Sequence, residues 1–330
     1  MAGTIHGVLV GFDGSPASEL AVAWGISEAL ARADVLTVCH AWGPGSPSPA
    51  TNADAEEHAR REAERVLAAG TLLARTLARK AAAWPGEIRS LLAAGPAAQV
   101  LCDQSARATM LVAGWRGHSG LAGLLLGSVS SQVAAHAQGP VVVVRGQWQR
   151  VPGRTPAPVV VGADGSAAAE PAVEFAFGEA AAHGVPVIAV CAMADNPQPL
   201  GHRHQIAADF ELQIDRWEKA HPEVVVRLLI HAGCARTALL EAARGASQLV
   251  VVGARGRGGL PGMKLGPVGQ AMLHHAPSPV AIVHPRPATH GNHESPRALA
   301  AAAACLDRPD AVAAAGPERT MIRTASRGAR

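Results

Sequence analysis

Short apolar runs rich in β-branched residues alternate along the chain with longer segments in which alanine is mixed with charged residues. In the first half, the runs that predict strands are 7–12, 35–41, 87–93, 109–113 and 140–145. The segments between them that predict helices are 16–32, 54–82, 96–106 and 127–138. Uninterrupted apolar strands suit a parallel sheet buried on both faces. Strands alternating with helices therefore predict a doubly wound α/β fold.

The pattern occurs twice. Residues 8–42 return in similar form at 159–193, and residues 110–144 return at 249–283. Because each copy contains a complete alternation of strands and helices, we predict two tandem domains of one fold.

The boundaries follow from changes in composition. We predict a first domain at 1–146, a linker rich in Pro, Gly and Arg at 147–157, and a second domain at 158–286. The remaining residues, 287–330, have no aromatic residue and no sustained apolar face. A segment of this kind cannot bury enough apolar surface to order itself, so we expect a mostly disordered tail.

Composition and charge exclude several classes of protein. No apolar run approaches the roughly 18 residues of a membrane helix, and the first residues lack the features of a secretory signal. Five scattered cysteines predict reduced thiols and a cytoplasmic protein. The formal net charge of +3 is carried by the tail from Arg286 onward, with seven arginines and four acidic residues. We therefore expect no membrane partner and no specific nucleic acid.

A ligand site is expected where the loops after the first and fourth strands meet. In an open parallel sheet, ligands bind beyond the carboxyl ends of the strands, at the point where the winding reverses. The first loop carries Asp13, and the fourth carries Gly114, Gly117 and Gly127. Glycines let backbone N–H groups approach a phosphate, and the helix that follows adds its free N–H groups. A carboxylate opposite suits ribose or a phosphate-bound metal, so the loops predict a mononucleotide site.

Other kinds of site do not fit the spacing. The chain has neither GxxxxGK[ST] nor a GxGxxG between the first strand and helix. The histidines at 202–204, 274–275 and 290–293 have no zinc-like spacing to cysteine or carboxylate. No GxSxG motif is present either. We therefore predict neither a metal centre nor a catalytic residue from these motifs.

The early DGS at 13–15, together with the spacing G-x2-G-x9-G-[ST] at 114–128, resembles the universal stress protein family in its tandem form. The resemblance covers about residues 5–286 and implies the strand order 3-2-1-4-5 in each domain. It also implies ATP, with Mg²⁺, at the switch point. Asp13 would contact the ribose, and the Ala41 backbone would lie beside the adenine. The residues that would surround the phosphates are Gly114, Gly117, Gly127, Ser128, Val129 and Ser130.

The second copy departs from this pattern at the phosphates. The corresponding residues there are Asp164, Met193, Gly253, Gly256 and Gly266. Pro267 stands where the first copy has Ser128, and Gly269 stands in place of Ser130. Proline is suited to the first turn of a helix but removes one backbone N–H. We expect a weaker or altered second site.

Several assignments stay open on the sequence alone. Asp13 has a structural alternative, a bond to the backbone of its own turn, and Ser128 has the alternative of capping its helix. Ser15 is expected to cap the first helix, with Ser166 in the same role in the second copy. The family resemblance also implies pairing through the last strand of each domain, at 140–145 and 279–284, either between two chains as a homodimer or within one chain.

The function expected from these observations is regulatory. An ATP-binding stress protein would act through conformation or through a protein partner that the sequence does not identify. AMP or another adenine nucleotide is an open alternative to ATP. A slow ATPase or phosphotransferase is a second hypothesis, and an interaction module with a vestigial second nucleotide site is a third.

Overall fold

The computed structural model describes residues 6–43, 53–81, 86–117, 126–145, 157–193, 200–244, 247–256, 263–284 and 319–322. The chain divides into two compact units, Met1–Trp148 and Gln149–Arg330. The division lies within the linker predicted from composition. Apart from residue 157, that linker lies outside the described residues, as does the predicted tail apart from 319–322.

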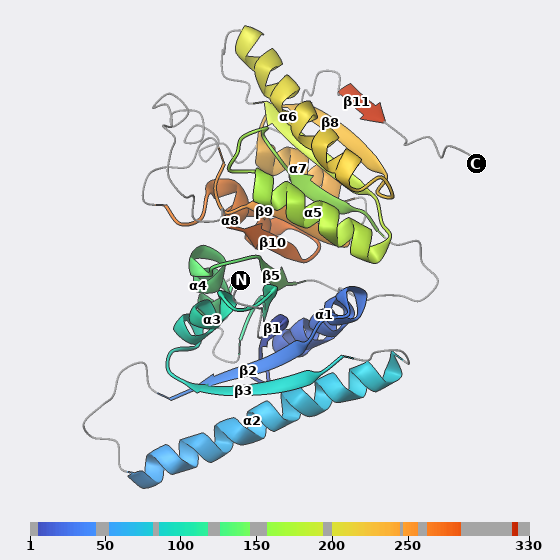
Figure 1. Ribbon diagram of the computed structural model, residues 1–330. Helices are drawn as coiled ribbons and strands as arrows, with labels where there is room; N and C mark the ends of the chain where they lie inside the picture. The colour runs from blue at the N-terminus through green and yellow to red at the C-terminus, as the bar shows by residue number, and fades with distance from the viewer. Residues whose placement is uncertain are drawn as a thin grey trace. The chain divides into compact units, whose positions relative to one another are not determined.

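The first unit is a parallel five-stranded sheet covered by helices. Its elements are β1 (Val8–Gly11), α1 (Pro16–Arg32), β2 (Leu36–Trp42), α2 (Ala53–Lys80), β3 (Ile88–Ala94), α3 (Ala97–Ser105), β4 (Met110–Gly114), α4 (Ser128–His136) and β5 (Val141–Val144). The strand order β3-β2-β1-β4-β5, with parallel neighbours, confirms the predicted doubly wound sheet. Helices α1 and α2 pack together, as do α3 and α4, and α2 runs along β2 and β3 (Figure 1).

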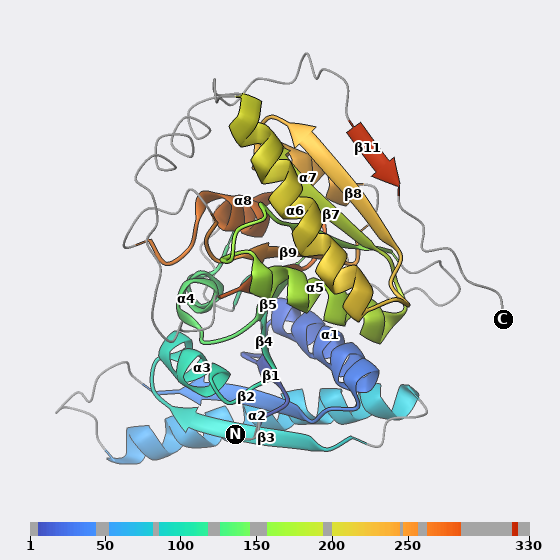
Figure 2. The ribbon, with the colours of Figure 1, turned by 45° about the horizontal axis from the view of Figure 1, so that its top comes forward.

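The second unit repeats this arrangement. Its elements are β6 (Val159–Gly162), α5 (Glu170–His183), β7 (Val187–Met193), α6 (Leu200–Ala220), β8 (Val226–Ala232), α7 (Ala235–Arg244), β9 (Leu249–Gly253), α8 (Pro267–His275), β10 (Val280–Val283) and β11 (Arg319–Ile322). The strands β8-β7-β6-β9-β10 lie in this order and are parallel. Strand β11 is antiparallel to β8 and continues the sheet at its outer edge (Figure 2). No strand was predicted in this part of the chain.

The apolar runs form strands because both faces of the central sheet are covered. Val8, Leu9 and Val10 of β1 are fully buried. Helix α1 has the predicted bounds, and its start has the predicted cause. The hydroxyl of Ser15 accepts a hydrogen bond from the backbone N–H of Ser18 (3.2 Å), with proline in the first turn.

The cysteines differ in one respect from the expectation of reduced thiols. Cys39, Cys102 and Cys191 are free, whereas Cys234 is disulfide-bonded. Scattered spacing along the sequence does not reveal which thiols the fold brings together, and the expectation was wrong for Cys234. Among the described helices, none combines the length and apolar character needed to cross a membrane.

Cys39 is expected to be an unreactive thiol. It lies on β2 with 1% of its surface exposed, and burial raises its pKa from the ordinary value of 9.0 to about 12. At pH 8 only about one such thiol in ten thousand is ionised, and the thiolate is the nucleophile. We expect Cys39 in the folded protein to react with iodoacetamide at least about 100-fold more slowly than in urea, as measured by peptide mass spectrometry.

The same pKa has a consequence for stability. Above pH 9 the unfolded chain releases the Cys39 proton more readily than the folded chain does. The contribution of this thiol to the free energy of unfolding is therefore complete below pH 9 and is lost as the pH rises towards 12. For the alkylation test, equal rates at Cys39 in folded and unfolded protein would contradict the assignment of Cys39 as an unreactive thiol.

Candidate functional site

Asp13 and Gly117 are brought together at the carboxyl ends of β1 and β4. The backbone N–H of Ser15 donates to Oδ1 of Asp13 (3.0 Å), so the predicted bond within the turn is present. The second oxygen, Oδ2, lies beside Gly117, where a Cβ atom would be 2.6 Å from it. The turn bond is therefore made through Oδ1, and Oδ2 is the oxygen on the side of Gly117.

Gly114 has a packing role. A Cβ atom on this residue would lie 2.5 Å from the carbonyl oxygen of Ala17 and 2.9 Å from the backbone nitrogen of Ser18. The missing side chain therefore lets the first turn of α1 lie against the end of β4. This close approach accounts for the glycine without any ligand, which spacing alone did not indicate.

Gly127 and the first turn of α4 form a group of backbone donors. Gly127 donates its N–H to the carbonyl of Trp115 (2.8 Å) and is the N-cap residue, without a side-chain cap bond. Ser128 is the first helical residue and is exposed, so the alternative that it caps α4 is wrong. The N–H groups of the first helical turn have no acceptor within the helix, and these are the groups that bind anions in other proteins.

The hydroxyl of Ser130 makes a structural hydrogen bond within the first unit. It is buried, and its hydroxyl donates to the carbonyl oxygen of Gly114 (2.6 Å). Since a hydroxyl has one proton, Ser130 in this arrangement braces α4 against the end of β4 and does not donate to a ligand. In the second unit, a Cβ atom on Gly269 would lie 2.6 Å from Cδ1 of Leu265, whose side chain occupies this space.

Two further contacts tie the loops of the first unit together. The hydroxyl of Ser15 donates to the carbonyl of Arg116 (3.4 Å), linking the loop after β1 to the loop after β4. The guanidinium carbon of Arg116 lies 4.6 Å from the centre of the Trp115 ring, a cation–π arrangement. Neither contact was predicted from the sequence.

The residues expected beside the adenine lie at strand ends. Ala41 is the next-to-last residue of β2, opposite Ala93, and Met193 is the last residue of β7. The registers Val8↔Leu36 and Val159↔Val187 make Met193 equivalent to Trp42 rather than to Ala41. The two predicted residues are therefore not counterparts.

His40 was missed by the sequence reasoning. It precedes Ala41 on β2, and its Nδ1 lies 2.7 Å from the carbonyl oxygen of Phe12. Because a carbonyl only accepts, Nδ1 carries the proton in this contact. The bond connects β2 to the residue before Asp13 and so helps to hold the loop after β1. The only sequence signal was a polar residue within an apolar run.

In the second unit, Asp164 accepts a different set of hydrogen bonds from those described for Asp13 in the first. Oδ1 of Asp164 accepts hydrogen bonds from both the N–H (3.0 Å) and the hydroxyl (2.5 Å) of Ser166. The expectation that Ser166 caps the following helix was wrong, because α5 begins later, with Ala169 as its N-cap residue. A Cβ atom on Gly256 would be 3.2 Å from Oδ2 of Asp164, so this pair also comes together.

Helix α6 approaches the aspartate loop of the second unit more closely than α2 approaches that of the first. Gly165 has a φ of +73°, and a Cβ atom there would lie 2.6 Å from the backbone nitrogen of Phe210. For Gly14 the nearest such atom is a side-chain carbon of Val66 at 3.8 Å. The second loop is therefore covered by backbone, whereas the first has space beside it.

A network centred on Glu170 holds α6 in this position. Its carboxylate accepts hydrogen bonds from Gln213 (2.7 Å), Arg216 (2.8 Å) and the indole N–H of Trp217 (2.8 Å). Gln213 also donates to the carbonyl of Ser166 (3.1 Å), which links the helix directly to the aspartate loop. The spacing of the three donors places them on one helix face, the only signal of the network in the sequence.

The second unit has glycines at the corresponding positions of its proposed phosphate site, but the helix there offers one backbone donor fewer. A Cβ atom on Gly253 would lie 2.8 Å from the carbonyl of Arg255, and one on Gly266 would lie 3.4 Å from that of Ala254. Gly266 is the N-cap residue of α8, which begins with Pro267. Since proline has no N–H, this helix offers one backbone donor fewer than α4.

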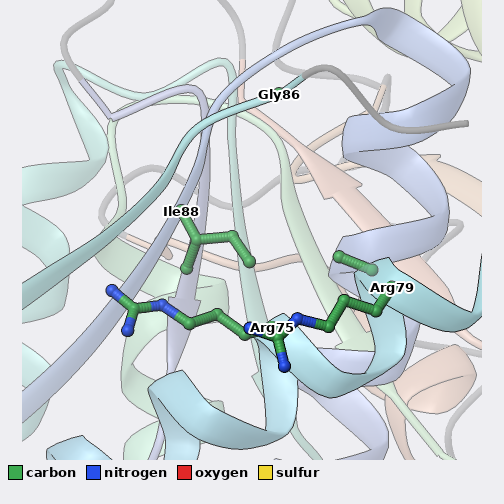
Figure 3. A pocket seen from close by; sticks show the side chains of 5 residues that line it. Arg75, Arg79, Gly86 and Ile88 are labelled. Atoms are coloured by element: carbon green, nitrogen blue, oxygen red, sulfur yellow. The ribbon is translucent and has the colours of Figure 1, made fainter.

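A separate open hollow lies at the other end of the first sheet. It has a volume of ≈ 290 Å³ and is lined by Arg75, Ala78, Arg79, Gly86 and Ile88. Figure 3 shows the two arginines extending from α2 near Ile88, which begins β3. The hollow contains none of the residues predicted for the nucleotide, because those lie at the carboxyl ends of the strands.

Comparisons with known proteins decide the family. A sequence profile of the universal stress protein family matches twice, at residues 4–145 and 157–284. The chain belongs to the universal stress protein family. A universal stress protein of Mycobacterium tuberculosis is 35% identical over 306 residues, covering 84% of this chain and 94% of the relative. One of Mycolicibacterium smegmatis is 35% identical over 306 residues, covering 86% and 98%.

Solved structures agree on the fold of this universal stress protein. The crystal structure of a universal stress protein from Archaeoglobus fulgidus aligns with a TM-score of 0.65 at 20% identity, covering 84% of this chain and 98% of that one. A protein of unknown function from Pseudomonas aeruginosa aligns with a TM-score of 0.56 at 14% identity, covering 85% and 93%. The family match, rather than these structures, confirms the resemblance stated from the DGS motif and the glycine spacing.

Proposed function

We propose that the first unit binds an adenine nucleotide, ATP with Mg²⁺, in the cytoplasm. The observation that carries the proposal is the contact between Asp13 and Gly117 beside the uncapped first turn of α4. The phosphates would lie against the N–H groups of Gly117, Ser128 and Val129, where backbone dipoles favour an anion. Asp13 would hold the ribose through its second oxygen.

Magnesium fits this donor set. Mg²⁺ is held in many nucleotide sites by one or two carboxylates together with phosphate oxygens. Asp13 is the carboxylate that the structure places at this loop. When bound with the nucleotide, the ion would neutralise phosphate charge, and it would be held mainly by phosphate oxygens and water while Asp13 contacts the ribose.

In this proposal the two units have different roles. In the second unit, Ser166 donates twice to Asp164, α6 covers the loop, and Pro267 removes a donor. Each lost neutral hydrogen bond weakens binding by about 0.5–1.5 kcal/mol, or roughly twofold to tenfold. These features support a weak or altered site there, and the second unit would serve mainly as an interaction module.

The nucleotide would act as a regulator of conformation or association. Because a ligand shifts an equilibrium only by its differential affinity, ATP must bind one state of the protein more tightly than another. The outer strands at 140–145 and 279–284 are the proposed pairing segments, between chains or within one. Sedimentation of the full chain with and without ATP tests this step, and identical distributions would contradict it.

Calorimetry with magnesium and ATP tests the binding site itself. The intact protein, freed of carried-over nucleotide, is compared with Asp13→Ala and Asp164→Ala variants. We expect one strong site that is lost in Asp13→Ala and retained in Asp164→Ala. Two equal sites would contradict the division between the units. The absence of binding by a folded protein would overturn the nucleotide function.

A further inference from the structure

The outer edge of β8 already holds a strand from the distant end of the chain. Arg319–Ile322 pairs antiparallel with β8 in the register Arg319↔Ile230 to Ile322↔Arg227. All other described strand pairs within this unit are parallel. Strand β11 is therefore an addition to the family's five-stranded sheet rather than a part of its winding.

An exposed β8 edge would be a hazard. Leu228, Leu229 and Ile230 form an uninterrupted apolar run on this outer strand. The unpaired N–H and C=O groups of such an edge are a template for another chain. Pairing with β11 satisfies these groups within the molecule.

The connection to β11 is long enough for this strand to leave its own β8 edge and pair with that of a second molecule. Strand β10 ends at Val283, and β11 begins at Arg319. Crossing the sheet from β10 to the position of β11 beside β8 requires about 25 Å at the usual strand spacing. With the Cys234 disulfide reduced, the intervening chain could extend to on the order of 100 Å. A connection of this length gives the strand an effective concentration of about millimolar order.

We propose that the β8 edge is a strand-docking site, occupied in cis by β11 and in trans by residues 319–322 of a second copy of this chain. The occupant is inferred from the pairing itself, because a segment that fits the edge in cis has identical chemistry in another molecule. Exchange between the two arrangements is a form of domain swapping. It links the tail to self-association independently of nucleotide binding.

The first test is hydrogen exchange on the full chain. It is run in reductant so that the disulfide of Cys234 is open. The variant Thr320→Pro/Met321→Pro removes donors at adjacent positions, one of which must point towards β8. We expect peptides spanning 226–232 to exchange at least about tenfold faster than in the wild type. The matched control is Ala313→Pro/Ala314→Pro, outside β11, and β3 at 88–94 serves as the internal reference.

The second test uses a labelled peptide of residues 316–325 as a stand-in for the tail of a second copy. By fluorescence anisotropy, we expect it to bind the full-length Thr320→Pro/Met321→Pro variant at least about tenfold more tightly than the wild type, whose edge is occupied. A peptide carrying the same two prolines is the control. Unchanged exchange at 226–232, or failure of the peptide to bind the variant, would overturn the proposal.

Discussion

The substitution Gly114→Ala is expected to lower the free energy of unfolding of the first unit by about 1–3 kcal/mol, the range typical of overpacking. The added Cβ would lie 2.5 Å from the carbonyl oxygen of Ala17 and 2.6 Å from its carbonyl carbon. These are backbone atoms of the first turn of α1. The helix must therefore move away from β4, which also disturbs the Ser130 brace to the Gly114 carbonyl.

Urea unfolding followed by circular dichroism measures this change, with Gly178→Ala as the control. Gly178 lies within α5, and a Cβ atom there meets nothing within 4 Å. Alanine is the better helix former by about 0.5–1 kcal/mol, so this variant should be as stable as the wild type or more stable. Equal midpoints for Gly114→Ala and the wild type would show that α1 has room that the structure does not indicate.

The substitution Gly117→Ala is expected to weaken ATP binding by about tenfold or more while leaving the fold intact. The added Cβ would lie 2.6 Å from Oδ2 of Asp13, the oxygen proposed to face the ligand. The clash is with the end of a side chain, so the carboxylate swings away at little structural cost. Hydrogen bonds to charged groups contribute about 1.5–3 kcal/mol, which corresponds to roughly tenfold to more than a hundredfold in affinity.

The matched control is Gly256→Ala in the second unit. There the added Cβ would be 3.2 Å from Oδ2 of Asp164, a milder contact in a unit proposed to bind weakly. Calorimetry should show the strong ATP site unchanged. If Gly256→Ala weakened the strong site as much as Gly117→Ala did, the assignment of that site to the first unit would be wrong.

The order of apolar and polar residues was sufficient to predict the two copies, the alternation of strands and helices, and the bounds of α1. These features are local or periodic. Burial on both faces makes a strand an unbroken apolar run, and the serine cap and proline mark a helix start within a few residues. The DGS motif and glycine spacing, repeated in both copies, were specific enough to indicate the family.

The roles of individual residues within these motifs depended on tertiary contacts. Spacing could not show that Gly114 admits α1 or that Ser130 bonds to the Gly114 carbonyl. It also could not show that Ser166 bonds to Asp164 instead of capping a helix. Each partner lies on a different element or competes with a local alternative, so the packed geometry decides which bond forms.

Strand β11 is a whole element that the sequence did not predict and that depends on tertiary contacts. Arg-Thr-Met-Ile at 319–322 is too short to show a period, and its surroundings in the sequence are polar or alanine-rich. A segment of this length forms a strand only where an existing edge supplies its hydrogen bonds. That edge, β8, is remote in sequence, and only the assembled sheet presents it.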